Sequence, residues 1–343
     1  MKKWIRSFFA IALIMLFAIM AVASGSKNES GETEATQKTE TQPEATKEAA
    51  SEADATEVAA TEVAATEAPT PVPEKDIYVV GDTYEDSNLR IVYMSSGVYE
   101  PTNSYYKPAD GNQYIFLRFY VENIGKTDQN ISYYDFDCYA DGYSCEQFYF
   151  ADDGLSATLS PGRTTTGTVC FEVPKTASEV EIEFEVNILT DKKIKFAYEG
   201  EKDSGYVPEN NTTETEDAYK PGDVAETSSL KITYVSAEET TSDNMFVQPK
   251  EGCRFLTFTF EFENISSSDV VVSAFSFDCY ADGAACEASY YRDDNLSTVT
   301  LSAGRKAQGT VTFEVPISAE IIEVEYDEMS LFGKRIVFSY QES

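Results

Sequence analysis

Apolar and polar residues alternate with a period of two along most of the chain beyond residue 80. Examples of such alternating apolar positions are Ile115, Leu117, Phe119, Val121, Leu256, Phe258, Phe260 and Phe262. Short alternating runs rich in Tyr, Phe, Val and Ile, separated by turn residues, are typical of antiparallel strands packed as a sandwich. No stretch shows a convincing helical period, so the pattern predicts an all-β fold.

The strand-rich part of the chain is repeated. Residues 81–95 (GDTYEDSNLRIVYMS) match residues 222–236 (GDVAETSSLKITYVS), and residues 167–174 (GTVCFEVP) match residues 309–316 (GTVTFEVP). Two copies of this length indicate tandem domains, because repeat solenoids have periods nearer 20–50 residues. We predict one sandwich over residues 77–199, a polar and acidic linker over residues 200–221, and a second sandwich over residues 222–343.

The N-terminal part has a different composition. Residues 1–23 combine a basic start, an apolar run and an Ala-x-Ala end, which is the pattern of a secretory signal peptide. Retention of this segment as a membrane anchor remains the alternative. Residues 24–76 are rich in Ala, Thr, Glu and Pro and contain no aromatic residue, so we expect a disordered acidic spacer. We therefore expect an extracellular or cell-surface protein with no membrane span after signal cleavage.

Charge and composition exclude several classes of function. The formal net charge of −34 argues against a nucleic-acid partner, whose phosphates require Lys and Arg. The chain has no histidine, which removes the usual general base, the Ser-His-Asp and Cys-His systems, and the common nitrogen ligand of zinc. The sequence therefore predicts a protein that is not an enzyme, with no catalytic residue, no resident metal and no cofactor.

The order of motifs resembles a known family. Each copy has a Gly-Asp before its first strand, a long strand ending in Glu-Asn, and an aromatic-Asp-x-x-Ala-Asp-Gly hairpin. Residues 159–174 (LSPGRTTTGTVCFEVP) are the most specific part, and the second copy departs from it at Ala303. These features resemble the bacterial extracellular domain of unknown function 4352, which is related to a small secreted mycobacterial antigen. The resemblance implies export and an immunoglobulin-like sandwich, and it assigns no reaction and no functional residue.

Four of the six cysteines occupy repeated hairpins, residues 136–146 (FDCYADGYSCE) and 277–287 (FDCYADGAACE). Asp-Gly at each tip predicts a two-residue turn, which places Cys138 opposite Cys145 and Cys279 opposite Cys286. Cross-strand pairs are close enough for a disulfide, and we expect two such bonds. Buried free thiols, a metal site and a redox pair remain alternatives. In the period-two alternation, Cys138 lies on the same face as Tyr134 and Phe136, and Cys279 lies on the same face as Phe275 and Phe277. We therefore expect all of these side chains on the apolar face.

Cys170 and Cys253 are not repeated, because the equivalent positions of the other copy are Thr312 and Asn112. The period-two alternation places both side chains on the outward face of their strands, so they either bridge the two domains or stay as exposed thiols. Two acidic loops, residues 151–156 (ADDGLS) and 292–297 (RDDNLS), allow calcium ligation as one interpretation. Adjacent Asp residues before Gly or Asn are more commonly turn formers.

An aromatic outward face is the remaining candidate for binding. On the long strand of the first copy it consists of Tyr114, Phe116, Arg118 and Tyr120. Such a face suits a protein or glycan partner, and its alternative role is to cover the sheet.

Together these observations predict two tandem immunoglobulin-like antiparallel β-sandwich domains after a disordered spacer. The favoured function is a non-catalytic binding, adhesion or surface-display module. A secreted carboxylate-dependent hydrolase and a calcium-stabilised structural surface protein are the alternatives. The sequence leaves the identity of the partner and the oligomeric state open.

Overall fold

The computed structural model describes residues 75–187, 192–209, 211–328 and 335–341, so the predicted signal peptide and almost all of the spacer lie outside the described residues. Within these ranges the chain forms strands and two short 3-10 turns, with no α-helix. The predicted all-β fold is confirmed. The described part of the chain also contains no helix with the length and apolar character needed to span a bilayer.

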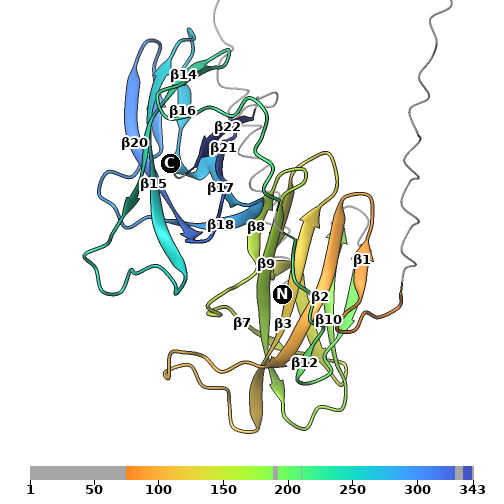
Figure 1. Cartoon of the computed structure of the whole chain (residues 1–343). Coiled ribbons are helices and arrows are strands. Elements are labelled where there is room, and N and C mark those ends of the chain that lie inside the picture. The colour runs from red at the N-terminus through yellow and green to blue at the C-terminus, as the bar shows by residue number, and fades with distance from the viewer. Residues whose placement is uncertain (1–74, 188–191, 210, 329–334, 342–343) are drawn as a thin grey trace, which may run out of the picture. The chain divides into compact units, whose positions relative to one another are not determined.

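The first sandwich consists of two main sheets (Figure 1). One sheet has the order β1-β2-β3-β9-β7, built from β1 (Thr83–Glu85), β2 (Leu89–Val98), β3 (Asn112–Asn123), β9 (Thr164–Pro174) and β7 (Glu146–Phe148). The other has the order β11-β10-β5-β6, built from β11 (Lys192–Ala197), β10 (Val180–Asn187), β5 (Phe136–Ala140) and β6 (Tyr143–Ser144). A small pair, β4 (Gln129–Ser132) and β8 (Ser156–Leu159), completes the domain.

The second sandwich repeats this arrangement. Its first sheet has the order β13-β14-β15-β20-β18, built from β13 (Val224–Glu226), β14 (Leu230–Thr240), β15 (Cys253–Asn264), β20 (Lys306–Pro316) and β18 (Ala284–Ser289). Strand β18 also pairs with β17 (Phe277–Ala281), which continues to β21 (Ile322–Tyr326) and β22 (Ile336–Tyr340). The small pair is β16 (Val270–Val272) with β19 (Val299–Leu301).

Each sandwich has its own core. Ile115, Leu117 and Phe119 of β3 are fully buried in the first core, which confirms their predicted inward face. Leu256 and Phe258 of β15 occupy the equivalent positions in the second core and are also fully buried. Because the alternating residues of both sheets meet there, each domain buries a full sandwich core of its own.

Repeated motif residues have a structural role. Asn123, at the end of β3, is completely buried, and its Nδ2 donates hydrogen bonds to the carbonyls of Thr127 (2.9 Å) and Leu159 (2.7 Å). Gly167 lies against Leu155 so closely that an added Cβ would be 2.6 Å from the Leu155 Cα. The Glu-Asn and Gly-Thr-Val motifs are therefore explained by packing rather than by chemistry.

The predicted linker, residues 200–221, contacts both sandwiches. Strand β12 (Lys202–Asp203) pairs with β2, and the Tyr206 ring packs 5.4 Å from that of Tyr120. Further along, the N–H of Asn211 donates to the carbonyl of Asp282 at 2.9 Å. All described residues fall within one compact unit.

Candidate functional site

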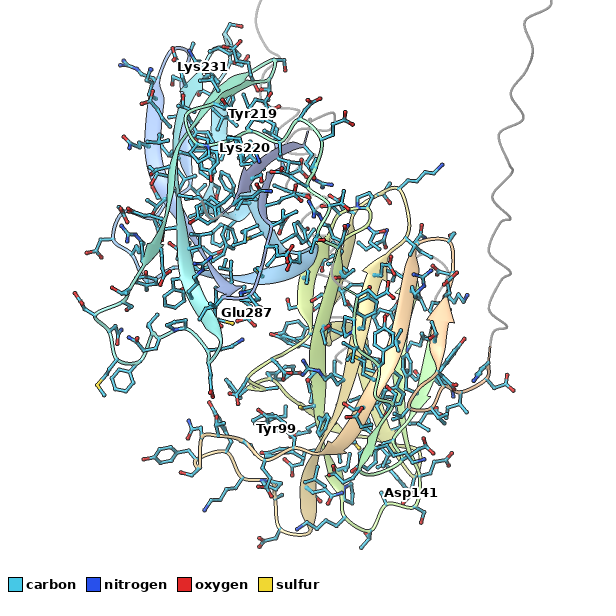
Figure 2. All side chains as sticks on the ribbon, viewed as in Figure 1. Tyr99, Asp141, Tyr219, Lys220, Lys231 and Glu287 are labelled. Carbon is cyan, nitrogen blue, oxygen red and sulfur yellow. The ribbon has the colours of Figure 1, made fainter. Side chains whose placement is uncertain are left out.

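The two cysteine-bearing hairpins turn at Asp-Gly, as predicted. Asp141 and Gly142 have φ values of 47° and 82°, and the values at Asp282 and Gly283 are 48° and 83°. Positive φ at both central residues is the two-residue turn that Asp-Gly favours. Asp141, labelled in Figure 2 at one end of the first sandwich, also accepts two backbone hydrogen bonds of 3.0 Å from the turn between β9 and β10. Both turns therefore hold the predicted register.

The paired cysteines are opposed in both hairpins. Cys279 faces Cys286 in the strand register, and the N–H of Cys145 donates to the carbonyl of Cys138 at 2.8 Å. The four residues are thiols in the structure, and the thiols of Cys145 and Cys286 donate to the carbonyls of Tyr143 at 3.6 Å and Ala284 at 3.7 Å. Burial raises the pKa of the Cys138 and Cys279 thiols, which disfavours their reactive thiolate forms. The disulfides stay a prediction that this geometry permits.

The expectation that the neighbouring aromatic residues share the buried face holds for Phe136 and Phe277, which are buried, and is wrong for Tyr134 and Phe275. Cys138 and Cys279 are buried, whereas the side chains of Tyr134 and Phe275 are 53% and 79% exposed. A 3-10 turn, η1 (Tyr133–Asp135) or η2 (Ala274–Ser276), comes directly before each hairpin strand. The turn resets the period-two alternation and directs these rings outward.

The outward face of β3 is largely covered. Tyr114 is buried in a small outer cluster with Phe148, whose ring centroid is 4.5 Å away, and Tyr120 is buried beneath Tyr206. Phe116 is half-buried at the edge of the same cluster. This geometry matches the alternative role of covering the sheet.

Arg118, the charged member of that face, forms an ion pair with Asp153 of the first acidic loop. The Asp153 carboxylate also accepts from the Thr168 hydroxyl at 2.9 Å, and Asp294 of the second loop pairs with Arg292 at 2.8 Å. Among the described residues, no group of three or more Cys, Asp or Glu side chains is placed to hold a metal ion. Both acidic loops thus use carboxylates in local bonds.

The two unrepeated cysteines lie in different surroundings. Cys170 is buried in the outer cluster beside Tyr114 and Phe148 rather than exposed, because loop residues cover that side of the sheet. Cys253 is half-buried at the start of β15. A bridge between Cys170 and Cys253 stays a prediction.

A groove of about 770 Å³ lies against the second hairpin and is also lined by residues of the first sandwich. Six aromatic residues line it: Tyr133, Tyr149, Phe275, Phe277, Tyr290 and Phe313. The Phe275 and Tyr290 rings contact each other with centroids 5.6 Å apart, and at the equivalent position of the first copy Tyr134 and Tyr149 are 5.4 Å apart. We call this site the aromatic groove. The Phe275–Tyr290 pair of the second copy therefore lines the groove. The Tyr134–Tyr149 pair of the first copy contributes Tyr149 to the lining.

The aromatic groove is acidic. Its lining carboxylates are Asp152, Asp153, Asp278, Glu287 and Glu314, and Lys250 is its single lining cation among the described residues. Lys250 is already paired with Glu287 at 3.0 Å. An excess of carboxylates beside aromatic rings favours a cationic ligand, because ring faces and carboxylates both attract positive charge.

Asp278 differs from the other groove carboxylates. Burial, reinforced by repulsion from Glu325, raises its pKa to about 6. At the equivalent position of the first copy, Asp137 faces Lys193, with 3.4 Å between the Asp137 Oδ2 and the Lys193 Nζ. Asp278 therefore titrates near neutral pH within a groove, which is typical of functional sites and of strained structural acids alike.

Comparison with known proteins identifies the family. The sequence model described as a domain of unknown function (DUF4352) matches residues 78–194 and 219–336. The chain belongs to this family. The two DUF4352 domains coincide with the two sandwiches described above, and a search of curated proteins found no match.

Several solved structures are similar to parts of the chain. A candidate lipoprotein of Bacillus subtilis (ycdA) is 15% identical over 34% of this chain and 38% of its own length, with a TM-score of 0.32. The yjhA protein of Bacillus subtilis is 12% identical over 35% of this chain and 97% of its own, with a TM-score of 0.31. The secreted protein MPT63 of Mycobacterium tuberculosis is 15% identical over 36% of this chain and 97% of its own, with a TM-score of 0.29. The chain thus spans well under half of the first of these proteins.

Sequence reasoning missed the aromatic groove. The signal was present, since Tyr134 corresponds to Phe275 and Tyr149 to Tyr290 at the constant offset of 141 residues. The period-two alternation predicted that Tyr134 and Phe275 lie in the core, because that pattern does not account for the 3-10 turns.

Proposed function

We propose that this DUF4352 protein is an exported, non-catalytic binding module whose aromatic groove holds a lysine- or arginine-bearing segment of a partner protein. The observation that carries the proposal is the aromatic pair repeated in both copies beside the carboxylates of the groove. The N-terminal signal pattern and the acidic spacer support export and display away from a surface.

The rings supply the contact area. Tyr149 and Tyr290 are each about half exposed, at 47% and 53%, although large aromatic side chains gain free energy by burial. A cation above a tyrosine face contributes about 0.5–2 kcal/mol, depending on its desolvation. Two such rings beside one groove can therefore hold two neighbouring basic side chains.

The carboxylates supply selectivity by charge. With a net charge of −34, the whole chain also attracts basic partners at long range and repels acidic ones. Because exposed charges are screened by salt, we expect binding to weaken as ionic strength rises.

Calorimetric titration of the full chain with a hexalysine peptide tests the proposal. Hexaglutamate and a chitin oligosaccharide serve as comparison ligands. We expect hexalysine to bind, and the double variant Tyr149→Ala/Tyr290→Ala to bind about tenfold more weakly, from the loss of two cation–ring contacts.

Tyr105→Ala is the matched control, because Tyr105 is 92% exposed and lies outside the groove lining. Its affinity should equal that of the unchanged chain. Equal binding by all three proteins, or binding of the glycan in place of hexalysine, would contradict the proposal.

A carboxylate-dependent hydrolase is the second candidate, and Asp278 is the observation that favours it. A carboxyl group with a pKa of about 6 suits a general acid near neutral pH. Turnover of a chromogenic glycoside by the full chain, abolished in Asp278→Asn with an unchanged melting temperature, would support this candidate over binding alone.

A further inference from the structure

A buried ion cluster joins the two sandwiches. Arg163, in the turn before β9, donates from Nη2 to Glu323 Oε2 at 2.6 Å and to Glu325 Oε1 at 2.7 Å, and from Nε to Glu325 Oε1 at 2.9 Å. Only 8% of Arg163, 1% of Glu323 and 4% of Glu325 is exposed. Charges buried to this degree require partners, so the contact is a specific one.

Further bonds complete this contact, which we call the arginine joint. The Arg163 guanidinium lies 4.6 Å from the ring centroid of Tyr280, whose hydroxyl donates to the carbonyl of Thr158 at 2.8 Å. The Ser160 hydroxyl donates to Glu325. The joint therefore has two halves, a turn with Ser160 and Arg163, and an acidic strand face with Tyr280, Glu323 and Glu325.

Because the domain is duplicated, the chain contains a second copy of each half. The turn recurs in the second sandwich as Ser302 and Arg305, and both of these residues are exposed. The acidic face recurs in the first sandwich as Tyr139, Glu181 and Glu183, all only partly buried. The arginine joint is a heterologous contact, because its two halves are different surfaces. Since each molecule also carries a second copy of both halves, the same contact can form between one molecule and the next.

Lys195 distinguishes the two acidic faces. In the first sandwich the Lys195 Nζ lies 2.6 Å from Glu181 Oε1, and Lys193 pairs with Glu183 at 2.8 Å. At the position equivalent to Lys195, the second sandwich has the uncharged Val337, and Glu323 forms its ion pair with Arg163. Lys195 thus supplies within its own domain the positive charge that Arg163 supplies across the joint.

We propose that the Ser302–Arg305 turn is a docking surface for the first sandwich of a second copy of this chain, and that Lys195 restrains this docking. The incoming Arg305 guanidinium would meet the Glu181 and Glu183 pair and the Tyr139 ring, as Arg163 meets their counterparts. Lys195 opposes it, since like charges brought together at an interface are strongly unfavourable. The Lys195 ion pair is itself partly exposed and therefore weak, so it can be displaced.

Sedimentation equilibrium of the full chain and its variants tests this inference. Lys195→Val should associate at concentrations at least tenfold lower than the unchanged chain, because a competing cation is removed and the valine of the second sandwich is reproduced. Lys195→Val/Arg305→Ala should lose this gain. Mixed with the unchanged chain, the same double variant should form one-to-one pairs, because one molecule supplies the open face and the other the turn.

Lys202→Val is the matched control, since Lys202 is a similarly exposed lysine paired with Glu199 at 2.9 Å. It should associate like the unchanged chain. The inference is overturned if Lys195→Val associates no more than Lys202→Val, or if its association persists when Arg305 is replaced. Circular dichroism of each variant establishes that the sandwiches remain folded in the comparison.

Discussion

Replacement of Arg163 by alanine is the most informative single change, because the chain contains its own control. Arg305 occupies the equivalent turn of the second sandwich and is exposed, whereas Arg163 is buried against Glu323 and Glu325. The two substitutions remove the same side chain from the same motif. Any difference between them therefore reports the arginine joint.

The expected magnitude follows from what Arg163→Ala leaves behind. Glu325 keeps Arg335, whose Nε lies 3.1 Å from Oε2, and Glu323 keeps the N–H of Thr215 at 2.7 Å. Removal of one member of a buried ion pair typically destabilises by about 3–5 kcal/mol. These remaining partners and rehydration of the carboxylates lower the figure, so we expect a loss of about 2–4 kcal/mol in the coupling between the sandwiches.

Differential scanning calorimetry and small-angle scattering measure that loss. We expect the unchanged chain and Arg305→Ala to unfold in one coupled transition, with a difference in unfolding free energy of less than about 0.5 kcal/mol. Arg163→Ala should unfold in two separated transitions and show a larger radius of gyration. If Arg163→Ala and Arg305→Ala melt alike and scatter alike, the arginine joint does not couple the two sandwiches.

Three further predictions concern pH, redox state and packing. The raised pKa of Asp278, about 6 against 3.8 for an ordinary Asp, means that the folded chain binds this proton more tightly than the unfolded chain. Its stabilising effect is therefore complete below about pH 4 and is lost as the pH rises through about 6, so Asp278→Asn should raise stability at pH 7.5 by about 1–3 kcal/mol in urea melts. In oxidised protein, Cys145→Ser and Cys286→Ser should each lower the free energy of unfolding by about 2.5 kcal/mol, the loop-closure value for an eight-residue loop, and have little effect in reduced protein; an equal effect in both states would argue against the bonds. Gly167→Ala should destabilise by about 1–3 kcal/mol, because its Cβ would lie 2.6 Å from the Leu155 Cα, and a neutral result would show that the strands can separate locally.

Local signals in the sequence predicted the parts of the fold that depend on near neighbours. Asp141-Gly142 determines its turn through positive φ at both residues, so the opposition of Cys138 and Cys145 could be worked out by counting. Period-two alternation likewise placed the core residues of β3 and β15 correctly. In each case the deciding interaction spans only a few residues or a single strand.

Long-range features could not be predicted in the same way. Arg163 and Arg305 occupy the same motif, and only the exchange of Lys195 for Val337 indicates which acidic face accepts an arginine from elsewhere. The outward direction of Tyr134 depended on a 3-10 turn that interrupts the alternation. Both features require three-dimensional placement of residues that no local pattern brings together.

The proposed function requires that the aromatic groove receives basic side chains on the repeated rings. Aromatic-ring chemical shifts of tyrosine-labelled full chain during titration with hexalysine measure this most directly. We predict saturable shifts of the Tyr149 and Tyr290 rings, which line the groove, and none of the 92%-exposed Tyr105 ring. If the groove rings do not shift, or if Tyr105 shifts by the same amount, the groove is not the binding site for basic side chains.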